Sequence, residues 1–125
     1  MKDIETMDDV KLMVDTFYGK IREDELLGEI FNNRIGDNWP VHLEKMYNFW
    51  GSILLGLTQY TGRPFPPHAE MNLEKYHFNQ WLNLFFDTLE ELFEGEKTDE
   101  AKGRANSIAA IFYAKIETIR MNNQK

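Results

Sequence analysis

Apolar residues recur at helical intervals along most of this chain, in blocks separated by short polar or glycine-containing breaks. The first block predicts a helix from Met7 to about Glu23, because its apolar positions fall on one face. These positions are Val10, Met13, Val14, Phe17, Tyr18 and Ile21. Thr6 or Asp8 is the expected N-cap. Tyr18 lies within the apolar stripe, so its hydroxyl needs a hydrogen-bond partner inside the protein.

Strong start and stop signals bound the next two predicted helices. A short helical piece carries Leu26, Leu27, Ile30 and Phe31 and should end at Asn32-Asn33, with Gly36 in the break. Asp37 or Asn38 should then cap a longer helix with Pro40 in its first turn, where a missing N–H is harmless. That helix should run to about Leu55, with Gly56 in the left-handed conformation that ends helices. Its inward face reads His42, Met46, Phe49, Trp50, Ile53 and Leu54.

Two further helices are predicted in the C-terminal half. Asn72 should cap the first, which runs from about Leu73 to Glu94, and Gly95 should close it. Its apolar side comprises Phe78, Trp81, Leu82, Phe85, Leu89, Leu92 and Phe93. Thr98 should cap the second, and its stripe comprises Ala101, Ala105, Ile108, Ala109, Phe112, Ile116 and Ile119. The polar tail from Met121 to Lys125 is expected to fray, and the whole pattern predicts an all-α fold.

One stretch does not fit a regular helix. It reads Tyr-Thr-Gly-Arg-Pro-Phe-Pro-Pro-His from Tyr60 to His68, with three prolines in four residues. Proline restricts the backbone, so His68 stands at the end of a stiff segment. A stiffly held imidazole is the ligand that a metal or haem iron needs, although a partly exposed loop histidine would give the same sequence.

Composition and charge narrow the classes of function. The 125 residues are enough for one domain, 1–125, with a substantial core. The formal charge of −7 disfavours nucleic acid and anionic membranes as partners. The chain has no cysteine, and therefore no disulfide or thiolate metal site. The sequence shows no signal peptide and no apolar run of membrane-spanning length, so we expect a cytoplasmic protein.

The inward faces of three predicted helices each carry one polar group among large hydrophobic side chains. These groups are the Tyr18 hydroxyl, the His42 imidazole and the Trp81 indole N–H, and the rigid stretch adds His68. An apolar aromatic cavity with a few donors and one nitrogen ligand suits haem, although each group alone is equally compatible with an ordinary core. The histidine spacing matches no helical zinc motif, and no nucleophile elbow is present.

Over nearly its entire length the chain resembles the truncated haemoglobins, and specifically their third group. The residues that carry the resemblance are Phe17-Tyr18, Ile30-Phe31-Asn32-Asn33, His42, Phe49-Trp50, Tyr60-Thr61-Gly62-Arg63-Pro64, His68, His77-Phe78, Trp81-Leu82 and the segment Arg104 to Phe112. The resemblance implies a two-over-two helical sandwich around haem b. The Pro66-Pro67 pair departs from the family pattern and should stiffen the loop before His68.

The resemblance also implies a role for each site residue. His68 would be the proximal iron ligand, and Tyr18, His42 and Trp81 would face the bound ligand. The haem pocket would include Phe17, Phe31, Met46, Phe49, Phe78 and Phe112. Arg63 and His77 are candidate partners of the haem propionates, with His77 alternatively a surface residue or, less favourably, a rival axial ligand.

The expected function is binding of dioxygen, and of CO, NO or other small ligands, for redox chemistry rather than bulk transport. Nitric oxide dioxygenation and a peroxidase-like reaction are the candidate activities, with an unidentified reductase as partner. A haem-free helical sensor or adaptor is the third alternative. We expect a monomer or a weak dimer.

Overall fold

The structure, a computed structural model, describes residues 1–56 and 73–123. Its elements are α1 (Met7–Glu23), α2 (Gly28–Ile35), the short 3-10 helix η1 (Gly36–Asn38), α3 (Trp39–Leu55), α5 (Lys75–Leu92) and α6 (Glu96–Asn123). Within these residues every regular element is helical, so the all-α prediction is confirmed. None of the described helices is both long and apolar enough to cross a membrane.

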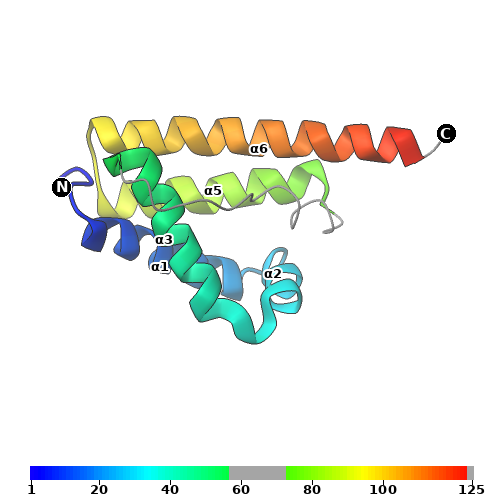
Figure 1. Cartoon of the computed structure of the whole chain (residues 1–125), viewed down its shortest axis with the longest axis horizontal. Helices are drawn as coiled ribbons and strands as arrows, with labels where there is room; N and C mark the ends of the chain where they lie inside the picture. The colour runs from blue at the N-terminus through cyan, green and yellow to red at the C-terminus, as the bar shows by residue number, and fades with distance from the viewer. Residues whose placement is uncertain (57–72, 124–125) are drawn as a thin grey trace.

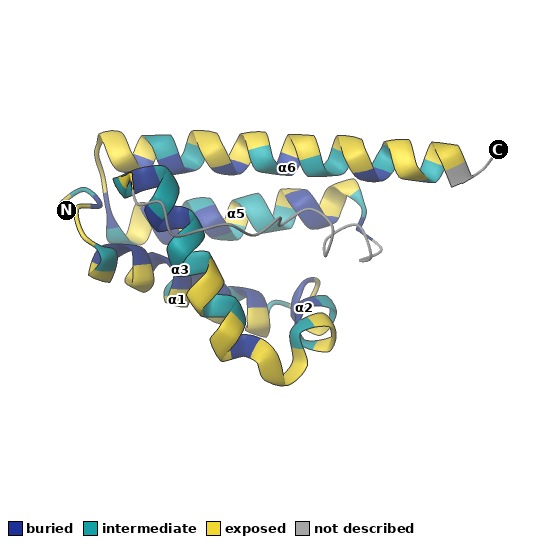
Figure 2. Cartoon of the chain, in the orientation of Figure 1, coloured by how far each residue is buried: buried dark blue, intermediate teal, exposed yellow. Residues whose placement is uncertain are grey.

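The helices form two packed pairs, α1 with α3 and α5 with α6. Helices α5 and α6 run antiparallel along each other, and α1 also packs against α5 (Figure 1). The side of α6 that faces α5 carries its buried positions, whereas the opposite side is exposed (Figure 2). The centre of the core is aromatic, because Phe17 of α1 and Phe85 of α5 are almost completely buried and their rings meet edge to face at 5.0 Å. This packing joins the two pairs.

The predicted bounds of α1 and α3 agree closely with the structure. Helix α1 has Thr6 as its N-cap, and Asp9 completes a capping box with it. Pro40 lies in the first turn of α3, and Gly56 ends that helix at φ 73°. Helix α2 differs from the prediction because it continues to Ile35, where Gly36 stops it at φ 57°.

Helix α5 begins later than predicted. Its first residue is Lys75, not Leu73, and its N-cap is Glu74, while the predicted cap Asn72 lies outside the described residues. The backbone N–H of Glu74 donates to Nδ1 of His77 at 2.8 Å, and the Glu74 side chain accepts from the backbone of the same turn. The helix ends at Leu92, with Phe93 as its C-cap, so the predicted end at Glu94 is two residues too long.

The N-terminus of α6 is capped by a residue from the other end of the chain. The Asp3 carboxylate accepts hydrogen bonds from the backbone N–H groups of Lys97 and Thr98, at 2.8 and 2.9 Å, and from the Thr98 hydroxyl at 2.8 Å. Burial alone would raise the pKa of Asp3, but these bonds outweigh it and lower the pKa. Thr98 is therefore a buried donor, and its predicted role as the cap is wrong.

Gly95 makes room for this long-range cap. It adopts φ 138°, and a Cβ atom there would lie 2.6 Å from Cγ of Asp3. Helix α6 then continues through Asn123, so the predicted fraying from Met121 is wrong for the first three tail residues. Ile119, placed on the buried stripe by its spacing, is 39% exposed because α6 extends beyond α5 at this end (Figure 1).

Candidate functional site

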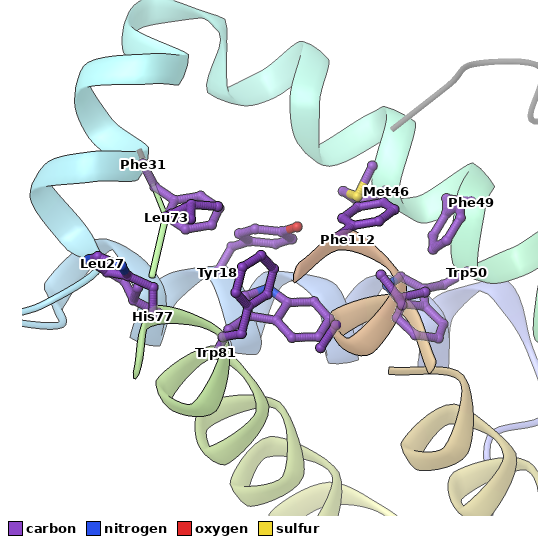
Figure 3. Close-up of a pocket in the computed structure, with 13 residues that line it drawn as sticks. Tyr18, Leu27, Phe31, Met46, Phe49, Trp50, Leu73, His77, Trp81 and Phe112 are labelled. Carbon is purple, nitrogen blue, oxygen red and sulfur yellow. The ribbon is translucent and has the colours of Figure 1, made fainter. Parts of the chain in front are cut away.

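A largely apolar pocket lies between α2 and α3 on one side and α5 and α6 on the other, with α1 contributing one residue (Figure 3). Its empty volume is about 680 Å³, counting the part that is open to solvent. The lining residues are Tyr18, Leu27, Phe31, Met46, Phe49, Trp50, Leu73, His77, Phe78, Trp81, Ile108, Ala109 and Phe112.

Tyr18 and Trp81 reach the pocket from different helices. Both lie near the middle of the close-up, between Phe31 on one side and Phe49 on the other (Figure 3). Tyr18 is only 6% exposed, and its position in the apolar stripe of α1 directs it inward. Trp81 is half-buried, and its ring stacks on Phe85 at 5.7 Å with an interplanar angle of 5°. The rigid core thus holds two potential hydrogen-bond donors at one apolar pocket.

His42, the third of the polar residues predicted to face inward, lies beside Tyr18. Its ring centroid lies 5.1 Å from that of Tyr18, with the two rings nearly perpendicular at 87°. The Nε2 atom of His42 is buried. His42 is not among the pocket-lining residues, so it lies behind Tyr18 rather than on the pocket wall. The structure therefore brings Tyr18 and His42 into contact and places Tyr18 and Trp81 at the same pocket.

Five of the six predicted apolar pocket residues line it: Phe31, Met46, Phe49, Phe78 and Phe112. The sixth, Phe17, does not line the pocket. It packs beneath it, edge to face against Tyr18 at 4.9 Å and Trp81 at 5.5 Å. Its near-complete burial makes it a support for these two side chains.

His77 lies inside the protein at the edge of the same pocket. It is 7% exposed, so the alternative that it is a surface residue is wrong. Its Nδ1 atom accepts the Glu74 N–H, which places the imidazole proton on Nε2 in the neutral form. Burial lowers the pKa of His77; nearby Glu74 raises it in part, and Arg120 lowers it further.

Sequence reasoning missed part of the site. Leu27, Trp50, Leu73, Ile108 and Ala109 also line the pocket, although their spacing marks them only as apolar helix positions. Trp39 was assigned no role, yet it is buried and contacts both Tyr18 and His42. Trp39 lies three residues before His42 on one helix, and this spacing could have indicated that the two side chains are in contact. The predicted proximal ligand His68 and the predicted propionate partner Arg63 lie outside the described residues.

Comparison with known proteins identifies the class. A model of the bacterial-like globin family matches residues 3–115, and the chain belongs to that family. It is 36% identical, over 104 residues, to the group 3 truncated hemoglobin ctb of Campylobacter jejuni, covering 80% of this chain and 82% of the relative. The crystal structure of group III truncated hemoglobin from Campylobacter jejuni matches with a TM-score of 0.85 and 33% identity, over 93% of this chain and 95% of that chain. These findings confirm the resemblance to the third group and the truncated globin fold.

Membership of the globin family implies binding of haem and, through it, of small ligands. The pocket fits such a group. Its walls are aromatic and aliphatic, as the faces of a flat apolar macrocycle require, and Tyr18, His77 and Trp81 contribute the few polar side-chain groups. The side chains of this donor set offer N–H and O–H groups to a bound molecule.

Proposed function

We propose that this protein binds haem b in the pocket, with His68 as the proximal iron ligand, and holds dioxygen or another diatomic molecule beside Tyr18 and Trp81. The observation that carries the proposal is the arrival of these two donor side chains, from α1 and α5, at one largely apolar pocket. The haem iron supplies the position at which a diatomic ligand binds. The assignment of His68 rests on the family resemblance and on the proline-rich sequence that precedes it.

Tyr18 and Trp81 are proposed to stabilise the bound ligand. The Tyr18 O–H and the Trp81 N–H can donate to the partly negative outer atom of dioxygen, each with a net contribution of about 0.5–1.5 kcal/mol. Because Phe17 and Phe85 pack against the Trp81 ring and Phe17 against Tyr18, the donors are held in place before the ligand arrives. Two such bonds favour a slowly released ligand, which suits redox chemistry better than transport.

His77 and Arg63 are proposed as partners of the haem propionates. The structure supports this role for His77, since its Nδ1 atom already accepts a backbone hydrogen bond and its Nε2–H remains as a donor at the pocket edge. A neutral N–H donor can bind a carboxylate without the cost of burying a second charge. Arg63 is proposed from the resemblance alone.

Protonation of His77 should make folding stability depend on pH. Because its folded pKa lies below the ordinary value of 6.5, the unfolded chain binds more protons just below that pH, and stability should fall as the pH drops from 6.5 through the folded pKa. Urea unfolding at a series of pH values measures this dependence. His77→Gln should flatten it, because glutamine at this position keeps a capping-box acceptor but does not titrate. An unchanged slope in His77→Gln would assign the pH dependence to other groups.

The proposed physiological reaction is nitric oxide dioxygenation. A haem held in this pocket would supply the iron for converting dioxygen and nitric oxide to nitrate. That conversion would leave the iron oxidised by one electron, so a reductase partner would have to return one electron in each cycle. Stopped-flow mixing of the oxygenated ferrous protein with nitric oxide should show rapid formation of the ferric spectrum and one nitrate per haem. Loss of the oxygenated spectrum without nitrate formation would contradict this assignment.

A peroxidase-like reaction is the second candidate, because the His42 imidazole contacts Tyr18 close to the pocket and could serve as a proton acceptor. The ferric protein mixed with hydrogen peroxide tests it. A rate no higher than that of free haem, unchanged in Tyr18→Phe, would exclude this activity.

A further inference from the structure

Trp39 is the buried first residue of α3, and groups from two other helices hold its indole ring. Its Nε1–H donates to Oδ1 of Asn32 at 3.1 Å, and the guanidinium carbon of Arg22 lies 4.7 Å from the ring centroid. Asn32 is oriented in turn, because its Nδ2 donates to the carbonyl oxygen of Arg22 at 3.3 Å. The indole is therefore fixed at its N–H and on its face by residues of α1 and α2.

The fixed indole contacts Tyr18, which is proposed to donate to the bound ligand, and His42, which is the candidate proton acceptor beside it. Trp39 and His42 lie three residues apart on α3, and their ring centroids are 5.6 Å apart with an interplanar angle of 87°. Tyr18 meets His42 at 5.1 Å and 87°, and meets Trp39 at 5.8 Å and 62°. All three rings touch one another in edge-to-face geometry. His42 cannot turn toward the pocket or toward solvent without losing contacts to rings on two helices.

We propose that Trp39 is a positioning residue that holds the His42 imidazole against Tyr18, and that the Asn32 hydrogen bond and the Arg22 contact set the position of Trp39. This inference rests on the proposed haem site. It assigns the orientation of His42, and thus its effect on a ligand at Tyr18, to a residue that does not line the pocket. The chain Asn32–Trp39–His42–Tyr18 would couple the junction of α1, α2 and α3 to the ligand.

A Trp39 that merely fills the helix junction would have a different signature. Its removal would lower stability but leave the influence of His42 on the bound ligand intact. The C–O stretching band of the carbon monoxide complex separates the two cases, because its frequency and width report the groups close to the ligand and do not report global stability. A double-mutant cycle between Trp39 and His42 isolates their coupling.

The experiment compares four proteins: wild type, His42→Leu, Trp39→Leu and the double variant, each as its ferrous carbon monoxide complex. In wild type, His42→Leu should shift or reshape the C–O band. In the Trp39→Leu background the same change should have less than half of that effect, because the imidazole is no longer held. Equal effects in both backgrounds, or no effect of His42→Leu in wild type, would overturn the inference.

Asn32 supplies a milder test in case Trp39→Leu folds poorly. Asn32→Ala removes the acceptor of the Trp39 N–H and should weaken the His42 effect. Asn32→Asp keeps that acceptor but loses the donor to the Arg22 carbonyl, so it should retain more of the His42 effect than Asn32→Ala does. Asn33→Ala, an exposed neighbour on α2, is the matched control and should leave the band unchanged. Absence of any haem or carbon monoxide complex in wild type would refute the proposed function itself, whereas a normal complex with additive variants would refute only the role of Trp39.

Discussion

His68→Ala should abolish stable haem binding. The proposed site has one nitrogen ligand for the iron, and the apolar contacts of the pocket walls cannot replace a coordinate bond. Haem titrated into the purified variant should give no stoichiometric Soret band and should pass rapidly to a competing apoglobin. Added imidazole should restore part of the band, since it can supply the missing nitrogen from solution.

His77→Ala is the matched control for this experiment. His77 is a second histidine at the same pocket, and its role is proposed to concern the haem edge rather than the iron. Its removal should leave the Soret spectrum nearly intact. The opposite pair of results, with haem retained in His68→Ala and lost in His77→Ala, would make His77 the axial ligand and reverse the proximal assignment.

The double variant Tyr18→Phe with Trp81→Phe should release dioxygen faster by about one to two powers of ten. Each lost hydrogen bond removes roughly 0.5–1.5 kcal/mol of stabilisation from the bound state, and 1.4 kcal/mol corresponds to a factor of ten. Each single variant should show part of the increase. Stopped-flow replacement of bound dioxygen by carbon monoxide measures the dissociation rate directly.

Tyr47→Phe provides the control for loss of a hydroxyl. Tyr47 lies on α3 away from the pocket, and its hydroxyl donates to Asp15 of α1. This variant should leave the dissociation rate of dioxygen unchanged. If Trp81→Phe also leaves the rate unchanged, the indole N–H does not reach the ligand and the stabilisation must come from Tyr18 or His42.

The parts of the fold that sequence reasoning predicted are those with local causes. The bounds of α1 follow from its apolar stripe and the Thr6 cap, and those of α3 follow from Pro40 and Gly56. The start of α6 depends instead on Asp3, more than ninety residues away in the sequence. No local pattern can reveal a cap that is supplied by tertiary structure. Threonine is a favoured N-cap residue, and Thr98 was assigned that role for this reason.

The same distinction applies to the site. Tyr18 and Trp81 were singled out because each places a polar tip within an apolar stripe, and their ligand-facing role was predicted from the family resemblance. Apolar pocket walls carry no such signal, so Ile108 and Ala109 could not be told from ordinary core, and Phe17 could not be told from a wall residue. Trp39 was missed because its meaning depends on contacts to α1 and α2.

The absorption spectrum of the reduced protein, recorded with and without carbon monoxide after expression with added haem, tests the central claim most directly. The proposed site predicts one haem per chain and a Soret band that shifts and sharpens when carbon monoxide binds. A protein that is folded and helical but shows no Soret band under these conditions would contradict the claim and would favour a haem-free helical sensor or adaptor.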